Sequence, residues 1–296
     1  MLARALSSAL ELRVVHTDHR GHAAELAAQA RLDGIDVIVV HGGDGTINEV
    51  VNGMLGPPNA VGHGVRKVPA LAVVPGGSAN VFARALGIPA DPLEATQQLL
   101  EAITGNSRRS VGLAHTDDRW FTVNAGLGWD AEVVQTVEEH RKNGKAATPA
   151  RYCWAAVSRY FRSKHHKPKM TVNLTGEEPR MGLHMVFITN TDPWTYLGAR
   201  PVRTNPQTSF SGGLGVFGLT SLSWFTIARV IPQILARDGN PRAGTLLRRD
   251  DVAQVRVRCS EPTGLQLDGD YLGLRSEVVF STVANAVQVL VQPKER

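Results

Sequence analysis

A glycine-rich segment is the first part of the chain whose residue types could do chemistry. Residues 42–46 read Gly-Gly-Asp-Gly-Thr and lie between an apolar run and an amphipathic segment. Consecutive glycines let backbone N–H groups approach an anion, and a following helix presents its positive dipole end to the same point. Thr46 and Glu49 fit a capping box, but a carboxylate at Asp44 needs a metal or a transferable proton nearby. The segment therefore predicts a phosphate-binding loop.

A second glycine segment repeats this arrangement. Residues 75–80 read Pro-Gly-Gly-Ser-Ala-Asn and again follow an apolar run. Alone, this segment is explained equally well by a turn with a serine helix cap. Open α/β sheets bind ligands at the carboxyl ends of their strands, so both loops are expected to line one crevice. Together they predict a nucleotide-binding site.

Two acidic residues near the C-terminus allow two interpretations. Asp268-Gly269 is a dipeptide typical of hairpin turns, and Asp270 follows it directly. Asp268 and Asp270 could instead be a carboxylate pair that binds a metal and removes a proton from a hydroxyl group. The local sequence leaves both interpretations open.

The N-terminal third alternates segments typical of strands and helices. Residues 36–40 and 71–74 have the composition of parallel strands buried on both faces, and residues 12–15 are a further strand candidate. Residues 22–32 have helical spacing of apolar residues. The helix after the first glycine loop has an apolar face of Ile47, Val50, Val51, Met54 and Leu55. The alternation predicts a doubly wound α/β domain.

The pattern changes beyond about residue 108, and most later segments are typical of strands. They are residues 121–124, 170–174, 185–189, 252–258, 277–283 and 287–291, with helices expected at 149–162 and 222–236. We therefore predict an α/β nucleotide-binding domain in residues 1–112 and a β-sandwich domain in residues 113–296.

Composition narrows the class of protein. The 296 residues are 43% hydrophobic and 20% charged, which suits a globular protein with two cores. No apolar run approaches the roughly 18 residues of a membrane span, and the N-terminus has no apolar core of signal-peptide type. Two distant cysteines predict reduced thiols and no metal site. These features predict a cytoplasmic protein.

The net charge of +5 favours an anionic partner. Residues 159–169 hold five Lys or Arg with Tyr160 and Phe161 interleaved, so they could bind the inner face of a membrane. The basic residues form no recognition helix and no aromatic-studded sheet, which argues against nucleic acid as the partner. A homodimer is left open.

The ordered set of motifs resembles the bacterial diacylglycerol kinases and related lipid kinases, which share a catalytic domain with sphingosine and ceramide kinases. More distantly it resembles NAD kinases and phosphofructokinases. The segments that carry the resemblance are Thr17 with residues 21–23, then residues 42–53, 77–84, 124–131 and 267–270. The Gly-Gly-Asp-Gly core is common to all these families, whereas the continuation Asn48-Glu49 is similar to the lipid kinases.

The resemblance implies an NAD kinase-like N-terminal domain that binds ATP, and a magnesium-dependent transfer of the γ-phosphate to a lipid hydroxyl, diacylglycerol first. By resemblance, Asp270 is the proton acceptor, Asp268 supports Mg²⁺, and Asp44 lies at the phosphate and metal. The implied ATP-binding residues are Thr17, Gly42, Gly43, Asp44, Gly45, Thr46, Asn48 and Ser78.

The sequence departs from the family pattern at several positions. The family's first strand and its Asn-Pro-x-Ser-Gly turn do not precede Leu12, so we expect the first strand to be missing. Asp270 stands where a Glu is usual, Val81 replaces a frequent Asp, and Gly212 provides no carboxylate for the relatives' structural magnesium site. Two alternatives stay open: a kinase of another acceptor (a sphingoid base, ceramide, phosphatidylglycerol or NAD), and a non-catalytic lipid- or nucleotide-binding protein.

Overall fold

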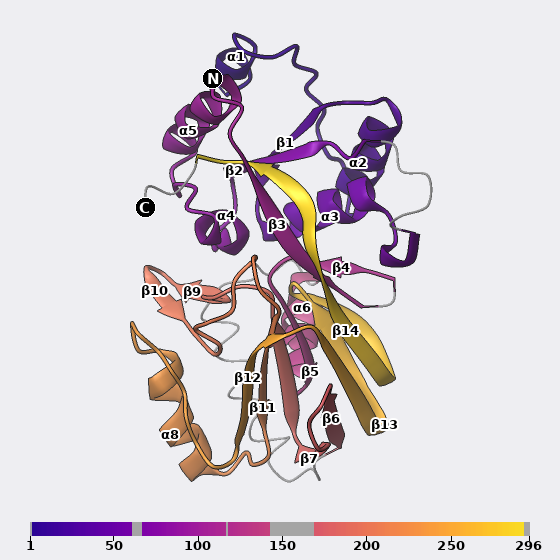
Figure 1. Ribbon diagram of the computed structural model, residues 1–296, viewed down its shortest axis with the longest axis vertical. Coiled ribbons are helices and arrows are strands. Elements are labelled where there is room, and N and C mark those ends of the chain that lie inside the picture. Colours follow the sequence, from indigo (N-terminus) through magenta and orange to yellow (C-terminus); the bar gives the residue numbers. More distant parts are fainter. Residues whose placement is uncertain (1, 61–66, 117, 143–168, 293–296) are drawn as a thin grey trace. The chain divides into compact units, whose positions relative to one another are not determined.

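The computed structural model describes residues 2–60, 67–116, 118–142 and 169–292. It divides into two compact units (Figure 1). Unit 1 comprises Met1–Thr122 and Val283–Arg296, and unit 2 comprises Val123–Thr282. The predicted fold class, an N-terminal α/β unit followed by a strand-rich unit, is confirmed. We expected a division after residue 112, whereas unit 1 also contains residues 113–122 and the C-terminal segment.

Unit 1 is built on a short sheet with a fully buried strand in its middle. β1 (Val37–Gly42) pairs in parallel with β2 (Ala70–Pro75), and every residue of β2 is buried. The end of β14 (Asp270–Leu290) lies beside β2, with Val289 opposite Leu71, and also pairs with β3 (Arg108–His115). β3 forms an antiparallel pair with the short β4 (Trp120–Phe121). The small and β-branched residues of β2 suit this burial on both faces.

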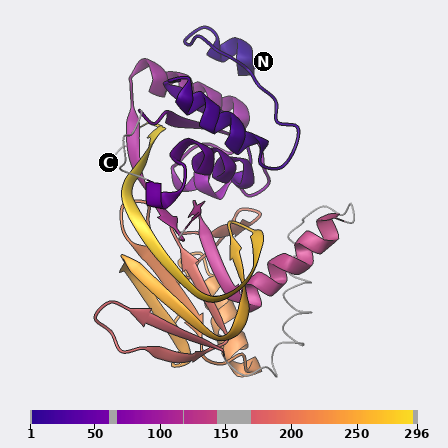
Figure 2. The same cartoon turned by 90° about the vertical axis from the view of Figure 1, so that its right-hand side faces the viewer.

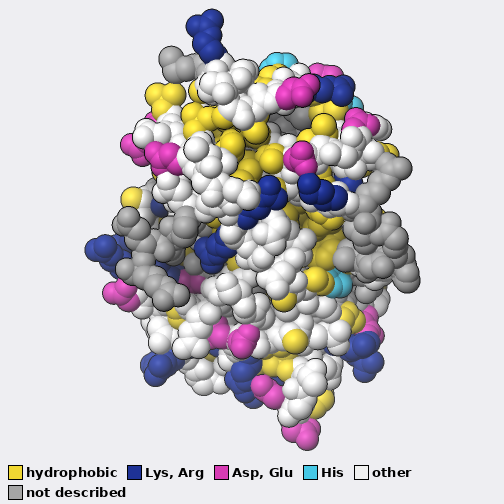
Figure 3. All heavy atoms as spheres, turned by 45° about the horizontal axis from the view of Figure 1, so that its top comes forward, with side chains coloured by type: hydrophobic (Ala, Val, Ile, Leu, Met, Phe, Trp, Pro, Cys, Tyr) yellow, Lys and Arg dark blue, Asp and Glu magenta, His cyan; other side chains and the backbone are white. Residues whose placement is uncertain are grey.

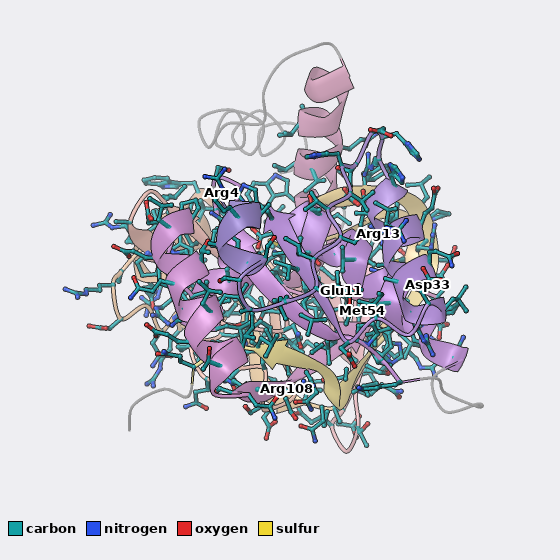
Figure 4. The ribbon with its side chains drawn as sticks, turned by 90° about the horizontal axis from the view of Figure 1, so that it is seen from above. Arg4, Glu11, Arg13, Asp33, Met54 and Arg108 are labelled. Carbon is teal, nitrogen blue, oxygen red and sulfur yellow. The ribbon has the colours of Figure 1, made fainter. Side chains whose placement is uncertain are left out.

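The helices of unit 1 are α1 (Leu2–Leu6), α2 (His22–Leu32), α3 (Asp44–Leu55), α4 (Val81–Ala85) and α5 (Pro92–Thr104). Two of them, α2 and α3, were predicted from their apolar spacing. The predicted face of α3 is buried, and Met54 lies amid the helices in Figure 4. A Cβ atom on Gly53 would lie 2.0 Å from the Ala24 carbonyl oxygen, so this glycine allows α2 to pack directly on α3.

Two local predictions for unit 1 are wrong. Residues 12–15 form no strand, and Val14 and Val15 are exposed because no neighbouring strand among the described residues covers them. The capping box of Thr46 and Glu49 is not formed, because α3 begins three residues earlier than it requires, at Asp44, with Gly43 as its N-cap. Thr46 therefore lies within the first turn of the helix.

Unit 2 is a mainly antiparallel sheet. Its strands are ordered β14, β13 (Gln254–Leu267), β5 (Asn124–Gly128), β8 (Met185–Thr189), β11 (Leu214–Leu219) and β12 (Leu246–Val252). β6 (Met170–Leu174) pairs with β13 and with β7 (Arg180–Leu183), and β9 (Thr195–Leu197) forms a hairpin with β10 (Arg200–Val202). Figure 2 shows β13 and β14, coloured orange and yellow, as long curved strands.

Two helices accompany this sheet. α6 (Trp129–Lys142) directly follows β5, and α8 (Trp224–Ile234) follows β11. Val230 of α8 packs with Phe187 of β8 and Phe217 of β11 in one apolar cluster. Within the described residues, no helix is long and apolar enough to cross a membrane. The expected helix at 149–162 and residues 159–168 of the basic segment lie outside the described residues.

Charged side chains do not gather in one stripe on the face shown in Figure 3. Lys and Arg side chains are interspersed there with Asp and Glu. The net charge of +5 is therefore not concentrated in a single patch on this face.

Candidate active site

The two glycine loops lie against each other at the carboxyl ends of β1 and β2. The Gly76 N–H donates to the Gly42 carbonyl oxygen at 2.9 Å. A Cβ atom on Gly77 would lie 2.7 Å from the Gly43 Cα atom, closer than real contacts of this kind. The parallel register of β1 and β2 brings the loops together, as the sequence predicted. Gly43 and Gly77 are therefore needed for backbone packing, whether or not a ligand binds.

Gly45 has a different environment. It is exposed in the first turn of α3, and a Cβ atom added there would meet nothing within 4 Å. A glycine in a helix costs about 1 kcal/mol relative to alanine. Because no contact within the chain requires Gly45, its missing side chain is best explained by a group outside the chain that approaches the start of α3.

Asp44 joins the two loops. Its Oδ2 accepts a hydrogen bond from the Val81 N–H at 3.0 Å, and its Oδ1 accepts one from the Phe82 N–H at 2.9 Å. These are the first two amides of α4, so the carboxylate caps that helix. The expectation that the Asp44 carboxylate needs a metal or a transferable proton nearby is therefore corrected: two amides of α4 hold its charge in place.

The second loop is closed by Asn80. This residue has a left-handed backbone with φ 48° and lies directly before α4. Its Oδ1 accepts from the Gly77 N–H at 2.9 Å and its Nδ2 donates to the Gly77 carbonyl at 2.8 Å. Ser78 lies exposed within this closed loop. Asp44 and Asn80 together fix both glycine loops without the help of a ligand.

Asn48 lies away from solvent, although the family resemblance implies that it binds ATP. Only 2% of it is exposed, and its Nδ2 donates to the Trp120 carbonyl at 3.1 Å. Asn52 donates to the same carbonyl at 3.1 Å and accepts from the Trp120 N–H at 2.9 Å. In the structure, Asn48 and Asn52 attach β4 to α3, which gives Asn48 a structural role.

The remaining predicted nucleotide-binding residues differ in position. Gly42 and Thr46 are in close contact, since a Cβ atom on Gly42 would lie 2.9 Å from the Thr46 Cβ atom. Thr17 lies exposed in the segment before α2, and no contact recorded among the described residues joins it to the glycine loops. The structure therefore brings residues 42–46 and Ser78 together, and leaves Thr17 apart.

In unit 2, Asp268 and Gly269 form the turn between β13 and β14. Their φ angles of 47° and 84° are both left-handed, as a two-residue type I′ turn requires, and Leu267 pairs with Asp270. Asp268 Oδ1 accepts from the N–H groups of Val123 and Asn124, both at 2.9 Å. The turn interpretation is therefore correct, and the carboxylate also holds the turn against β5.

Gln266 is a functional candidate that the sequence reasoning missed. It is 1% exposed, and its Oε1 accepts from the Gly269 N–H at 2.9 Å. Its Nε2 donates to Asn124 Oδ1 at 2.9 Å and to Asp130 Oδ2 at 2.8 Å. A buried amide with three partners fixes the turn that carries Asp268 and Asp270. The signal in the sequence is a polar residue in an apolar strand, two positions before Asp-Gly.

Asp130 lies at the other end of this network, in the first turn of α6. Its carboxylate occupies the space beside Gly126, where a Cβ atom would lie 1.8 Å from Asp130 Oδ2. Burial raises the pKa of the Asp130 carboxyl to about 6, and the hydrogen bond from Gln266 opposes this shift. Gly126 is therefore required so that the acid can approach Gln266.

We expect Asp130→Asn to change the pH dependence of stability. Between an unfolded pKa of 3.8 and a folded pKa of about 6, the folded protein keeps a proton that the unfolded chain has lost. The free energy of unfolding therefore falls as the pH rises through this window. Asparagine still accepts the hydrogen bond from Gln266 but does not titrate. The decrease in unfolding free energy across this pH window should therefore be about 1–3 kcal/mol smaller in the variant than in wild type.

Urea unfolding at several pH values between about 4 and 7 measures this effect. Burial also raises the pKa of Asp192 to about 6. Because Asp192 is present in both proteins, the difference between their pH slopes comes from Asp130. Asp238→Asn, at an exposed position, is the matched control. An identical pH slope in wild type and Asp130→Asn would contradict the assignment.

The loop at Gly212 has a carboxylate supplied from another strand. Asp251, with φ 60°, accepts from the Gly213 N–H at 2.6 Å through Oδ1. A Cβ atom on Gly212 would lie 3.2 Å from the same oxygen. Asp251 of β12 thus places a carboxylate beside Gly212, the position at which the loop itself provides none. Within the described residues, no group of three or more His, Cys, Asp or Glu gathers to hold a metal ion.

Comparison with known proteins agrees with the motifs. Residues 2–109 match the family model of the diacylglycerol kinase catalytic domain. A Bacillus subtilis diacylglycerol kinase is 28% identical over 285 residues, covering 93% of this chain and 84% of that protein. A Staphylococcus aureus diacylglycerol kinase is 38% identical over 112 residues, which is 38% of this chain and 31% of that protein.

Solved structures show the same fold. A crystal structure of a diacylglycerol kinase from Bacillus anthracis superposes with a TM-score of 0.68 at 20% identity, covering 98% of this chain and 88% of that chain. The likeness therefore extends over both units, whereas the family model covers the N-terminal part. Residues 2–109 are thus similar to the diacylglycerol kinase catalytic domain, and the chain resembles a bacterial diacylglycerol kinase along most of its length.

Proposed function

We propose that this protein is an ATP-dependent lipid kinase that transfers the γ-phosphate to a lipid hydroxyl, with diacylglycerol as the leading acceptor and phosphatidic acid as the product. The observation that carries the proposal is the pair of glycine loops fixed beside the open position at Gly45. Such a loop at a helix start suits a phosphate group. The similarity of the chain to diacylglycerol kinases supports the choice of a lipid acceptor.

The glycine loops of unit 1 are assigned to the nucleotide. Backbone N–H groups at the start of α3 would hold phosphate oxygens, and the exposed Ser78 hydroxyl can donate to them. Asp44 is already fixed by α4 through two hydrogen bonds. Catalysis of phosphoryl transfer consists mostly of positioning and charge stabilisation, and a rigid loop supplies both.

The hairpin of unit 2 is assigned to the acceptor hydroxyl. Asp270 is half-buried at the start of β14 and would accept the hydroxyl proton as the phosphoryl group is transferred. Asp268 would contribute to Mg²⁺, which usually takes one or two protein carboxylates together with substrate phosphates. Oxygen donors alone make this site suitable for magnesium, whose charge offsets the phosphate charge when it is bound. Gln266 keeps both acids in place.

Transfer of labelled phosphate from ATP to diacylglycerol in mixed micelles tests the proposal. A panel of ceramide, sphingosine, phosphatidylglycerol and monoacylglycerol tests the acceptor, and NAD in a detergent-free assay tests a soluble one. We expect diacylglycerol to be the best substrate. ATP binding without transfer to any acceptor would favour the non-catalytic alternative. The proposed place of action is the cytoplasmic face of the membrane.

Gly45→Ala should separate nucleotide binding from stability. Alanine meets no atom within 4 Å, so the variant should be as stable as wild type or up to about 1 kcal/mol more stable. The added methyl group should weaken ATP binding about tenfold or more, because it fills the space assigned to phosphate. Thermal unfolding and calorimetric ATP titration measure the two effects.

Gly77→Ala is the matched comparison for this prediction. Its methyl group would press on the Gly43 Cα atom at 2.7 Å, so stability and ATP binding should fall together. Unchanged ATP affinity in a well-folded Gly45→Ala variant would refute the assigned phosphate position.

A further inference from the structure

Helix α8 exposes a group of large apolar side chains. Phe225 is 77% exposed, Trp224 65% and Ile231 43%. The rings of Trp224 and Phe225 are neighbours, with centroids 5.9 Å apart. Single exposed apolar residues are common on protein surfaces, whereas an adjacent Trp and Phe on one helix are not explained by folding.

The opposite side of α8 already fulfils the structural role of the helix. Val230 is buried against Phe187 and Phe217, and Ile227 and Ile234 pack on the same cluster. Residues four, seven and eight positions after a given residue lie on the same side of a helix. The outer side of α8 is therefore formed by Trp224, Ala228, Ile231 and Pro232. α8 is therefore apolar on both sides, a pattern typical of a helix that is covered all round.

The charges around α8 are positive. Arg229 lies on the helix, Arg237 follows it, and the Arg242 backbone N–H donates to Gln233 at 2.8 Å. All three arginines are exposed, and none has an ion pair recorded among the described residues. Asp238 is the single acidic residue of the chain between residues 223 and 244. The polar surroundings of the apolar group are thus basic.

We propose that α8 is a membrane-docking helix whose outer face, Trp224, Phe225 and Ile231, inserts into the interface of an anionic phospholipid bilayer while Arg229, Arg237 and Arg242 bind lipid phosphates. Trp is favoured at the boundary of a bilayer, and a basic rim around an apolar face is typical of interfacial helices. A second copy of the chain fits less well, because it would bring arginines against arginines. The inference rests on the proposed function, since the acceptor lipid lies in such a bilayer.

Binding to vesicles tests the helix without any turnover. We expect the protein to float with vesicles of phosphatidylcholine and phosphatidylglycerol, and about 100-fold more weakly with phosphatidylcholine alone. The double variant Trp224→Ser/Phe225→Ser should bind the anionic vesicles at least tenfold more weakly. Met181→Ser is the matched control, since Met181 is 72% exposed on β7 and should bind as wild type does.

Two further variants identify the source of binding. Replacing Arg229, Arg237 and Arg242 by Gln should remove the preference for anionic vesicles, at about fivefold per arginine. Trp224→Phe should keep vesicle binding but lose part of the tryptophan quenching by brominated lipid, because the indole itself enters the bilayer. Unfolding midpoints equal to wild type would show that these variants fold.

The outcomes separate the two proposals. Full vesicle binding by the Trp224→Ser/Phe225→Ser variant would overturn the docking helix, whatever the kinase activity. If the wild-type protein is dimeric in sedimentation equilibrium, and the same variant is monomeric but binds vesicles as before, then a second copy of the chain covers this face of α8. If the wild-type protein shows no lipid kinase activity and the Trp224→Ser/Phe225→Ser variant still loses vesicle binding, the role of α8 is supported and only the proposed function is refuted.

Discussion

Replacement of Asp270 by Asn is expected to lower the rate of phosphoryl transfer by about 10²–10⁴-fold, the contribution of a positioned general base. Asparagine has nearly the same shape as aspartate and keeps the pairing with Leu267, which uses backbone groups. The variant should therefore fold and bind ATP as wild type does. Rates of labelled-phosphate transfer, with ATP binding measured separately, test this expectation.

Asp268→Asn provides the comparison within the same turn. Asn-Gly is the preferred dipeptide of a type I′ turn, and Asn Oδ1 can still accept from the Val123 and Asn124 amides. The turn should keep its shape and lose only a charge. If Asp268 supports magnesium, this variant needs more Mg²⁺ for half-maximal rate; if it is only a turn residue, the requirement stays the same. A wild-type rate for Asp270→Asn would show that Asp270 is not the base.

Asp44→Asn is expected to reduce both stability and activity. The carboxylate accepts from two amides, Val81 and Phe82, whereas an asparagine can accept through only one atom. Its NH₂ group would face the second amide, which should cost about 1–3 kcal/mol of unfolding free energy. The charge assigned to the phosphate and metal is also lost, so the transfer rate should fall about 100-fold or more.

Asp91→Asn is the control for the capping part of this effect. Asp91 caps α5 by accepting from Leu93 and Glu94 at 2.8 and 3.1 Å, and asparagine is an equally good N-cap there. Its stability and rate should remain close to wild type. A folded Asp44→Asn protein with the wild-type transfer rate would mean that Asp44 only joins the loops.

The sequence predicted those elements whose causes are local. β1, β2, α2 and α3 were found from apolar spacing, and the predicted strands at 170–174 and 185–189 coincide with β6 and β8. The start of α5 also has a local cause, because Asp91 is its N-cap and Pro92 occupies its first position. Residues 12–15 failed because four residues with strand composition form a strand only beside a partner.

The site was less predictable because its contacts join distant parts of the chain. Asp44 accepts from Val81 and Phe82, which are 37 and 38 positions further along the chain. Asn48 donates to Trp120, which is 72 positions away. Two of the three partners of Gln266, Asp130 and Asn124, are 136 and 142 positions away. The motifs therefore located the loops, but only the tertiary structure revealed that Asp44 is a cap, Asn48 a support for β4, and Gln266 the residue that fixes the turn.

The course of β14 has a consequence for how the protein is made. This strand starts at the hairpin of unit 2 and ends between β2 and β3 of unit 1. On a ribosome, β2 and β3 emerge long before the strand that joins them, so unit 1 cannot complete its sheet until unit 2 has been synthesised. Unit 2 is in effect an insertion in unit 1. Loss of the end of β14 would therefore disrupt the sheet of unit 1, whose other strands are translated first.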